Sequence, residues 1–442
     1  MGFDIPAGVG RILRTLSAAG YEAFLVGGCV RDLLRGVEPH DWDICTSARP
    51  EQTELCFAGL RIIETGLKHG TITVAADGAA YEITTFRTEG PYSDGRRPDY
   101  VVFGAGLEAD LARRDFTVNA MALGPDGVLR DPFGGAADLR AGVIRCVGEP
   151  ARRFQEDGLR LMRALRFGAA LGFELETDTA RAIHENGPML RYVAAERIRE
   201  ELVRLLPGPG AGGLLRRYPD VLCRFWPELG PLTELEQNTP WHCWGGWEHT
   251  VRAVEAAPAD PVLRLAVLLH DVGKPSCKTT DEQGIDHFFG HAAAGAKLAD
   301  GMLRALKFDN RTREQVTALV ARHDLPLPPQ ERPVRRWLGR LGPEQFFRLL
   351  EVKRADNLGQ SPELARGRLT ELDAVRALAE ELIARGQCFS LRDLAVNGRD
   401  VIAAGTPPGP EVGRTLDALL EQVLSGEVPN ERAILLKRIG RE

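Results

Sequence analysis

The spacing of hydrophobic residues divides the chain into a strand-rich beginning and a long helical remainder. Residues 10–20 carry apolar side chains at helical intervals, and residues 22–27 form an apolar run typical of a buried strand. β-Branched or alternating runs predict further strands at 70–75, 81–86 and 118–123. After Ala151 the apolar residues recur at helical spacing, interrupted by loops. The pattern predicts an α+β fold: a small mixed head with a β-sheet and helices, followed by a helical neck, a further helical domain and a helical tail.

Stretches rich in proline and glycine mark the expected joints of the chain, at 207–210 and 227–240. A chain of 442 residues is too long for one ordinary core, so two to four domains are expected. A polar, turn-rich segment at 88–99 predicts a mobile loop within the head. We expect four parts: a head at 1–145, a helical neck that selects the nucleotide at 146–235, a metal-binding helical domain at 236–385, and a tail at 386–442.

Composition narrows the class of protein but does not identify it. With 44% hydrophobic and 27% charged residues, the chain is typical of a soluble protein. It has no uninterrupted apolar stretch of roughly 18–20 residues and no basic, then apolar, secretory leader, so no membrane partner is expected. Eight cysteines without a CxxC pair argue against disulfides and predict a reduced, cytoplasmic protein. The net charge of −6 excludes only a uniformly basic surface, and the sequence predicts no particular oligomeric state.

Two glycines and two aspartates give the strongest chemical signal in the head. Gly27 and Gly28 end the first apolar run, and Asp41 and Asp43 follow one residue apart. Alternate residues of a strand share a face, so the two carboxylates should project side by side and hold Mg²⁺. The glycines would let a polyphosphate approach the backbone amides. This pattern predicts in-line attack on a nucleoside triphosphate between two Mg²⁺ ions, although a lone Asp-x-Asp is also common at solvated strand ends.

A third carboxylate, Glu82, lies in the strand-like run at 81–87 and is a candidate to complete this site. An exposed strand glutamate without a function fits the local sequence equally well.

Asp157 and Arg160 are candidates for recognising a base. They are three residues apart, so a helix would place both on one face. A carboxylate accepts a hydrogen bond from an exocyclic amine, and a guanidinium donates to a ring nitrogen or carbonyl. Cytosine and adenine both present an amine beside an acceptor, whereas guanine and uracil present the reverse order. The pair would therefore accept C and A and reject G and U; the alternative is an exposed ion pair without a function.

Six of the nine histidines fall between His242 and His323, which indicates a second metal site. His270 and Asp271 close an apolar helix, where burying both is costly unless they are paired or bind a metal. Imidazole with carboxylate suits Mn, Fe, Ni, Co or Zn better than Mg²⁺ alone. The candidate ligands are His249, His270, Asp271, His291, His323 and Asp356. His242, His287 and Asp324 are either bystanders or replacements for one of these.

Several motifs that follow the aspartate pair give the head and neck a family resemblance. They lie at 113–121 (RRDFTVNAM), 131–139, 153–160 (RFQEDGLR) and 196–202 (ERIREEL). The glycine and aspartate pairs resemble the DNA polymerase β-like nucleotidyltransferases. In this order, over roughly 20–205, the motifs resemble the class II tRNA nucleotidyltransferases, namely the CCA-adding enzymes and their bacterial poly(A) polymerase relatives. The tail at 391–439 is also similar to that family.

The resemblance implies roles for further residues. Gly27, Gly28 and Arg31 would belong to the nucleotide site, and Arg114, Asp115 and Asn119 would lie near the ribose and triphosphate. Arg163 and Arg166 would neutralise phosphate charge. The motif at 196–202 would brace the neck, the loop at 88–99 would help the change from CTP to ATP, and the tail would contact the tRNA elbow.

The histidine and aspartate order resembles the HD-domain phosphohydrolases, which are all-helical metal enzymes that cleave phosphate esters. It implies two metals with an activated water between them. The implied substrates are 2′,3′-cyclic phosphates, 2′-phosphates or damaged RNA 3′ ends. An HD fold that is only structural, or that only supports RNA, is the alternative.

The leading hypothesis is an enzyme that adds CCA to the 3′ end of tRNA from CTP and ATP, with HD phosphohydrolase activity in addition. A poly(A) polymerase, or an enzyme that adds only the cytidines or only the adenosine, would share these motifs. A different class of function is an HD phosphohydrolase whose head binds RNA without catalysis; the presence of Asp41, Asp43, Asp157 and Arg160 argues against it.

Overall fold

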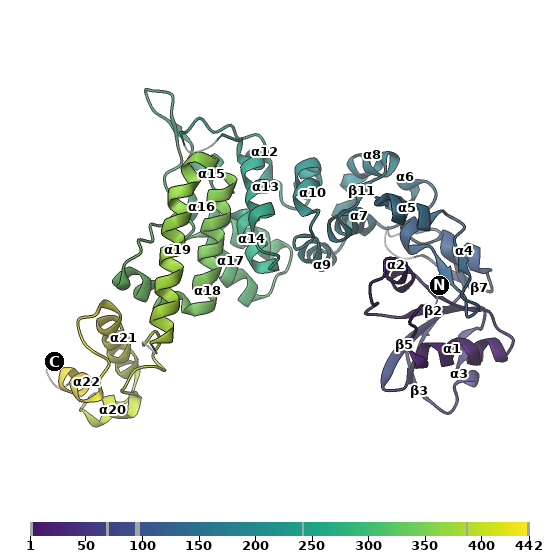
Figure 1. The fold of residues 1–442 in the computed structure, drawn as a ribbon, viewed down its shortest axis with the longest axis horizontal. Helices are drawn as coiled ribbons and strands as arrows, with labels where there is room; N and C mark the ends of the chain where they lie inside the picture. The colour runs from purple at the N-terminus through teal and green to yellow at the C-terminus, as the bar shows by residue number, and fades with distance from the viewer. Residues whose placement is uncertain (1–2, 68–69, 93–97, 241–242, 386–387, 440–442) are drawn as a thin grey trace. The chain divides into compact units, whose positions relative to one another are not determined.

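The computed structural model describes residues 3–67, 70–92, 98–240, 243–385 and 388–439 (Figure 1). The chain folds into two compact units, Met1–Pro227 and Glu228–Glu442. The finer division into four parts stays a prediction.

A seven-stranded sheet forms the centre of the first unit, with strand order β3-β4-β5-β2-β1-β8-β9. Strand β2 pairs in parallel with β5, whereas the other neighbours pair antiparallel. The β2–β5 register places Asp43 directly opposite Glu82. The strands are β1 (Ala23–Val26), β2 (Asp43–Thr46), β3 (Arg61–Gly66), β4 (Thr71–Ala76), β5 (Ala79–Thr85), β8 (Ala122–Leu123) and β9 (Leu129–Arg130).

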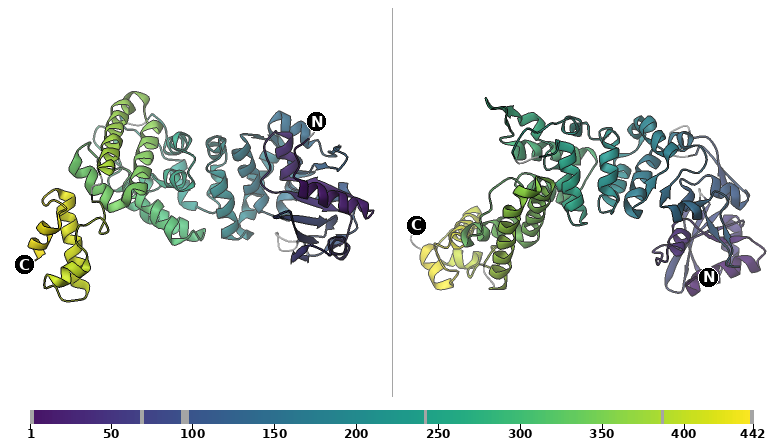
Figure 2. Two further views of the ribbon diagram at one scale, coloured as in Figure 1. Left: turned by 60° about the horizontal axis from the view of Figure 1, so that its bottom comes forward. Right: turned by 45° about the horizontal axis from the view of Figure 1, so that its top comes forward.

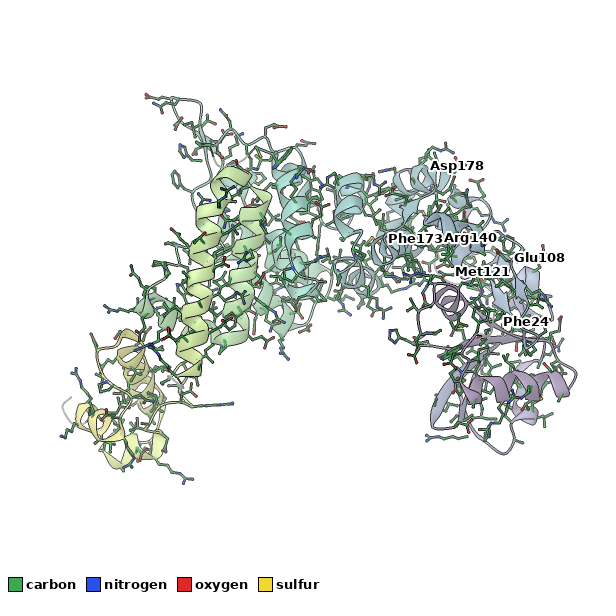
Figure 3. The ribbon with its side chains drawn as sticks, viewed as in Figure 1. Phe24, Glu108, Met121, Arg140, Phe173 and Asp178 are labelled. Atoms are coloured by element: carbon green, nitrogen blue, oxygen red, sulfur yellow. The ribbon has the colours of Figure 1, made fainter. Side chains whose placement is uncertain are left out.

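Amphipathic helices cover this sheet and bury its core. Helices α1 (Ala7–Ala18) and α3 (Pro50–Cys56) contact each other and pack on β1 and β4 (Figure 1). Phe24 and Met121, labelled in Figure 3, are both buried in the head. The remaining elements of the head are α2 (Gly28–Leu34), α4 (Leu107–Ala112), α5 (Gly135–Ala141) and the hairpin of β6 (Arg87–Glu89) with β7 (Val101–Phe103).

Short helices complete the first unit after the head. Helices α7 and α9 pack together, as do α6 and α8, and β10 (Val143–Ile144) pairs in parallel with β11 (Glu174–Leu175). Helix α6 ends at Glu156 and α7 begins at Leu159, so Asp157 and Gly158 form the junction between them. The helices are α6 (Pro150–Glu156), α7 (Leu159–Leu171), α8 (Thr177–Asn186), α9 (Ala195–Leu205), α10 (Ala211–Arg217) and α11 (Pro219–Leu222).

The second unit is helical apart from the two-residue strands β12 (Thr279–Thr280) and β13 (Asp286–His287). Its long helix α18 (Glu331–Gly359) bends at Gly342, where φ is 71° and Pro343 follows. Helices α18 and α19 lie side by side in all views (Figures 1 and 2). The other helices are α12 (Gly230–Thr233), α13 (Gly246–Ala256), α14 (Pro261–Leu269), α15 (Lys274–Cys277), α16 (His291–Ala305), α17 (Asn310–Val320), α19 (Pro362–Ala384), α20 (Gly398–Ala403), α21 (Pro410–Ser425) and α22 (Arg432–Ile439). No described helix is long and apolar enough to cross a bilayer.

The α+β class and the change to helices after the head are confirmed, whereas two local predictions are wrong. The segment 118–123 is not one strand: a 3₁₀ turn at Thr117–Asn119 precedes the short β8. Part of the loop expected at 88–99 belongs to β6, and its residues 93–97 lie outside the described residues.

Candidate functional site

The glycine pair forms a sharp turn beside the carboxylates of the head. Gly27 has φ of +77°, a conformation that favours glycine, and Gly28 begins α2. A Cβ on Gly27 would lie 3.0 Å from Nη1 of Arg114 and 3.6 Å from Oδ2 of Asp43. The backbone therefore passes close to a carboxylate and a guanidinium, and a side chain at residue 27 would fill the space between them.

Three carboxylates border this turn. Asp43 begins β2 and lies opposite Glu82 of β5, the candidate third carboxylate. Asp41 is not on the strand, because β2 starts two residues later, so the expected alternation along one strand is wrong for this residue. Asp41, Asp43 and Glu82 are all exposed.

The electrostatics of Asp43 fit a cation at this position. Desolvation, together with the charges of Glu82 and Asp41, raises the pKa of Asp43 above its ordinary value, while Arg114 acts in the opposite direction. A divalent cation would relieve this repulsion, and an all-oxygen donor set suits Mg²⁺. Within the described part of the chain, the ligand atoms that cluster within 4.8 Å belong to the second unit instead. The head carboxylates thus form a more open group.

Arg114 is positioned by a residue that sequence reasoning missed. Asp110 of α4 is fully buried, and its carboxylate lies 3.5 Å from Nη2 of Arg114 and 2.9 Å from Nη2 of Arg113. The spacing of three and four residues on a helix was the signal available in the sequence. Asp110 holds both guanidinium groups beside the sheet.

A hydrogen-bonded chain connects α2 to α7 through the motif at 113–121. Arg31 donates to Oδ1 of Asn119 over 2.8 Å, and the Asn119 amide donates to Asp115 over 3.3 Å. Asp115 accepts from Nε of Arg163 over 2.8 Å. Burial opposes ionisation of Asp115, but Arg163, Arg160 and the Asn119 hydrogen bond lower its pKa to about 2. One continuous hydrogen-bonded network therefore joins Arg31, Asn119, Asp115 and Arg163.

Arg163 and Arg166, expected to neutralise phosphate, each have a carboxylate partner within the protein. Arg163 pairs with Asp115, and Arg166 pairs with Glu201 of α9. The Arg166 guanidinium lies 3.7 Å from the centre of the Phe167 ring. Arg166 is not among the residues that line the neighbouring cavity, whereas Arg163 is.

Asp157 and Arg160 line one cavity, but not by the predicted geometry. Asp157 lies outside both helices, with φ of −142°, so the pair does not share a helix face. Its Oδ1 accepts from the Leu159 amide over 3.0 Å, and its Oδ2 accepts from Arg197 over 2.9 Å. Arg160 is held by Oε2 of Glu156 at 2.7 Å. Each base-reading candidate thus has a separate partner that fixes its orientation.

The cavity beside this junction has a volume of about 420 Å³ and a strongly charged wall. Glu89 of β6 contributes through an ion pair with Arg113 at 3.0 Å and a hydrogen bond from Tyr92. Burial and Glu89 raise the pKa of Tyr92, so it remains a neutral donor. The lining residues are Arg87, Glu89, Tyr92, Pro98, Arg113, Arg114, Asp115, Asp157, Arg160, Arg163 and Arg197. Glu89, Tyr92 and Arg197 were not singled out from the sequence.

The second unit brings the predicted histidines and aspartates together around Asp271. His249, His270, Asp271, His291 and His323 are all buried, and their ligand atoms form two groups within 4.8 Å. Oδ2 of Asp271 lies 3.3 Å from Nε2 of His249 and 3.2 Å from Nε2 of His270. Its Oδ1 lies 3.6 and 3.7 Å from Nε2 of His291 and His323. Asp271 therefore faces two sets of ligands with its two oxygens.

The remaining contacts add one further carboxylate and fix the directions of three imidazole rings. Asp356 of α18 joins the first group, with Oδ1 3.1 Å from Nε2 of His249. Nδ1 of His270, His291 and His323 each lies within 2.9 Å of a backbone carbonyl, which leaves the three Nε2 atoms directed inward. Burial disfavours protonation of His270, but Asp271 and Asp356 raise its pKa to about 10, so the cluster favours a cation.

Three further residues were offered by the sequence as bystanders or as replacements for one of these ligands. His287 pairs with Asp281 at 2.8 Å, and it lines the same cavity without belonging to either ligand group. Asp324 also lines that cavity. His242 lies outside the described residues.

Family models match most of the chain. The "Poly A polymerase head domain" matches residues 23–145, the "Probable RNA and SrmB- binding site of polymerase A" matches 172–217, and the "tRNA nucleotidyltransferase domain 2 putative" matches 279–439. The sheet, the glycine turn and these matches define a nucleotidyltransferase with a poly(A) polymerase type of head.

Relatives and solved structures narrow the class to one family. A CCA-adding enzyme of Geobacillus thermodenitrificans is 38% identical over 95% of this chain and 93% of its own length. One from Lactobacillus delbrueckii is 36% identical over 96% and 95%. The crystal structure of the Bacillus stearothermophilus CCA-adding enzyme in complex with CTP covers 98% of this chain and 96% of its own, at 33% identity and a TM-score of 0.71. The chain belongs to the class II CCA-adding enzyme family, and it is a tRNA nucleotidyltransferase.

Proposed function

We propose that this chain adds CCA to the 3′ end of tRNA, taking CTP and ATP as substrates and using Mg²⁺. The observation that carries the proposal is the cavity in which Asp157 and Arg160 are each fixed by a separate partner, close to the motif that holds Arg114 beside Asp43. Curated relatives along the whole chain are CCA-adding enzymes, and solved structures of such enzymes contain CTP, ATP or tRNA.

In this proposal the three head carboxylates hold the metal ions. Bound Mg²⁺ would lower the pKa of the tRNA 3′-hydroxyl and neutralise charge on the triphosphate. Asp41, Asp43 and Glu82 supply the oxygen ligands, and the turn at Gly27 and Gly28 leaves room for the triphosphate. The 3′ oxygen attacks the α-phosphorus, the bond to the bridging oxygen breaks, and pyrophosphate leaves.

Base choice would depend on the neck. The Asp157 carboxylate accepts from the exocyclic amine of cytosine or adenine, and Arg160 donates to the neighbouring ring nitrogen. Both patterns are reversed in guanine and uracil, so those bases would place donors against Arg160. Arg31, Arg114, Asp115 and Asn119 would position the ribose and phosphates.

The test uses a tRNA transcript that ends at the discriminator base, incubated with CTP, ATP and Mg²⁺ and resolved on a sequencing gel. Growth by three nucleotides followed by a halt is expected. A long ladder with ATP alone would identify a poly(A) polymerase, and a stop after two cytidines or one adenosine would identify a partial enzyme. Asp43→Ala should abolish addition, whereas Asp77→Asn, on the exposed turn between β4 and β5, should not.

We propose a second activity, phosphohydrolysis, at the histidine–aspartate cluster. The observation that favours it is the shared Asp271, whose two oxygens face two groups of buried Nε2 atoms. His249, His270, Asp271 and Asp356 would hold one ion, and Asp271, His291 and His323 the other. Nitrogen-rich donors favour Mn, Ni, Co, Fe or Zn over Mg²⁺. Water would add to phosphorus, the ester P–O bond would break, and the ribose oxygen would leave with a proton.

Metal content and hydrolysis test this activity independently of the head. Metal-loaded protein should open 2′,3′-cyclic AMP, and His270→Ala/Asp271→Ala should lose both the metal and the hydrolysis while keeping CCA addition. Asp43→Ala should keep hydrolysis. A metal-loaded protein that leaves the cyclic phosphate intact would reduce the cluster to a structural role and leave the first proposal unaffected.

A further inference from the structure

An aromatic pair stands beside the histidine–aspartate cluster and is not used by the proposed chemistry. Phe289 is 80% exposed, the largest exposed fraction among the large hydrophobic residues that the structure describes. Its ring stacks on His287, with centroids 5.4 Å apart and an angle of 7° between the planes. The Phe289 ring is thus stacked on one neighbour and otherwise open to solvent, an arrangement that leaves room for a second flat group.

The hairpin β12–β13 fixes His287 in this position. Asp281 accepts from the amides of Gln283 and Ile285 over 3.0 and 2.8 Å, and its other oxygen pairs with Nε2 of His287 at 2.8 Å. Asp286, the strand residue before His287, is buried. It forms an ion pair with Lys278 and accepts hydrogen bonds from Thr280 and the Asn238 amide. The stacked pair is therefore held by a braced turn.

The pair also lies on the wall of the cavity that contains the cluster. A single cavity of about 510 Å³ is lined by His287 and Phe289 together with Asp271, His291, His323 and Asp356. Phe289 is separated from His291 in sequence only by Gly290, whose φ of +79° makes the turn into α16. An ester bound at the ligand groups would therefore share this cavity with the stacked pair.

Cationic side chains on the same wall suit a phosphate. Lys274 contacts Oδ2 of Asp271 at 2.7 Å, and Arg368 donates to Gln360 over 2.9 Å while also lining the cavity. The cavity therefore combines metal ligands and cations for a phosphate with flat rings for a planar group. A nucleoside phosphate has both parts, and aromatic stacking accepts every base because each has a π-face.

We propose that His287 and Phe289 form a nucleobase platform, so that the cluster acts on nucleoside phosphates and discriminates against phosphate esters that lack a base. The choice of substrate rests on the proposed phosphohydrolase function, whereas the binding of a base to the platform can be tested without it. The ligand is either a free mononucleotide or the terminal nucleoside of an RNA strand, which share this chemistry. The base would lie on the open face of Phe289 with the ribose phosphate directed toward Asp271.

The kinetic test compares Phe289→Ala with Phe289→Trp on metal-loaded full-length protein. Phe289→Ala should raise KM for adenosine 2′-monophosphate by about five- to a hundred-fold, the range expected for loss of one stacked base. Phe289→Trp should restore it. Hydrolysis of ribose 5-phosphate, which has no base, should be unchanged in both, and Leu358→Ala, an exposed residue of α18, serves as the matched control.

A binding test keeps the inference separate from hydrolysis. Fluorescence of 2-aminopurine riboside 2′-phosphate should be quenched by stacking on wild-type protein and less on Phe289→Ala; the nucleotide site of the head contributes equally to both. A short RNA ending in the same nucleoside distinguishes the two sources. Equal quenching and equal KM ratios in wild type and Phe289→Ala would overturn the platform. Quenching that depends on Phe289 without any hydrolysis would overturn the phosphohydrolase proposal and leave the platform standing.

Discussion

Arg197 provides the sharpest test of how base choice is controlled, because it contacts Asp157 and comes from a different helix. Its Nη2 lies 2.9 Å from Oδ2 of Asp157, and its Nη1 lies 3.3 Å from Oδ1. The Leu159 amide holds only Oδ1, over 3.0 Å. Replacing Arg197 with alanine would leave the carboxylate anchored at one oxygen and free to rotate at the other.

The size of the effect follows from the burial of this contact. Hydrogen bonds to charged groups contribute about 1.5–3 kcal/mol, and the Asp157 and Arg197 side chains are 14% and 27% exposed, which reduces that contribution. A loss of about 1–2 kcal/mol corresponds to a decrease of roughly five- to thirty-fold in kcat/KM for CTP and ATP. Selectivity for CTP over UTP should fall as well, because the rotated carboxylate no longer selects an amine.

The assay measures kcat/KM for CTP on tRNA that ends at the discriminator base and for ATP on tRNA that ends in CC. UTP and GTP are the competitors. Arg197→Lys should lie between wild type and Arg197→Ala, because a lysine cannot make the two-pronged contact. Arg181→Ala is the matched control: its pair with Asp178, labelled in Figure 3, is 63% and 60% exposed. Rates and selectivity of Arg197→Ala within two-fold of wild type, in a folded protein, would refute the reasoning.

Three further predictions concern the head and its network. Gly27→Ala forces a side chain into positive φ and places Cβ 3.0 Å from Arg114, so nucleotide addition should fall at least ten-fold with an unchanged circular dichroism spectrum. Asp115→Asn should lower the free energy of unfolding by about 2 kcal/mol at pH 7, from the difference between pKa values of 3.8 and about 2. Because the folded pKa is the lower one, this stabilisation is present above pH 4 and is lost as the pH falls toward 2, so acid titrations of wild type and variant should converge there. Glu156→Gln should weaken the hold on Arg160 and reduce selectivity against GTP and UTP more than kcat, measured in the same misincorporation assay.

Local chemistry explains which parts of the head could be predicted. The apolar runs of β1, β4 and β5 and the helix that starts at Gly28 depend on residues that are neighbours in sequence. Glu82 was ambiguous in sequence because nothing local places it opposite Asp43, and only the parallel pairing of β2 with β5 does so.

The helix junction at Asp157 shows where sequence reasoning fails. A helical periodicity extends across 150–171, and the one local mark of the break is the Asp157-Gly158 dipeptide, which is typical of turns. The structure supplies the reason: a Cβ on Gly158 would lie 2.9 Å from the carbonyl oxygen of Met189, so the backbone at residue 158 meets a distant segment closely. The break coincides with this tertiary contact, and at the junction Asp157 accepts hydrogen bonds from Arg197, which lies 40 residues away.

The carboxylate partners of Arg163 and Arg166 could not be predicted from neighbouring residues either. Arg163 and Arg166 lie 48 and 35 residues from the carboxylates that they contact, so their sequence positions gave only a helical spacing. The positive charges of Arg163 and Arg166, which the sequence suggested would neutralise phosphate, are partly neutralised by Asp115 and Glu201. A guanidinium that already pairs with a carboxylate can still donate a hydrogen bond to a phosphate. It then contributes an oriented donor but little net positive charge.

The structure brings together histidines and aspartates that the sequence offered as ligands, and part of their geometry is set by residues close in sequence. His270, His291 and His323 each place Nδ1 near the carbonyl of the residue three positions earlier, namely Val267, Phe288 and Val320. Chain turns at helix ends create that contact, so the direction of each Nε2 is set within four residues. Helix packing then places the three imidazole rings, already oriented, around Asp271. The order of histidines and aspartates along the sequence was therefore sufficient to suggest these residues as ligands. The base-reading pair has local contacts too, from the Leu159 amide to Asp157 and from Arg160 to Glu156. Its chemistry could be predicted but its geometry could not, because the contact of Asp157 with Arg197 joins residues 40 positions apart.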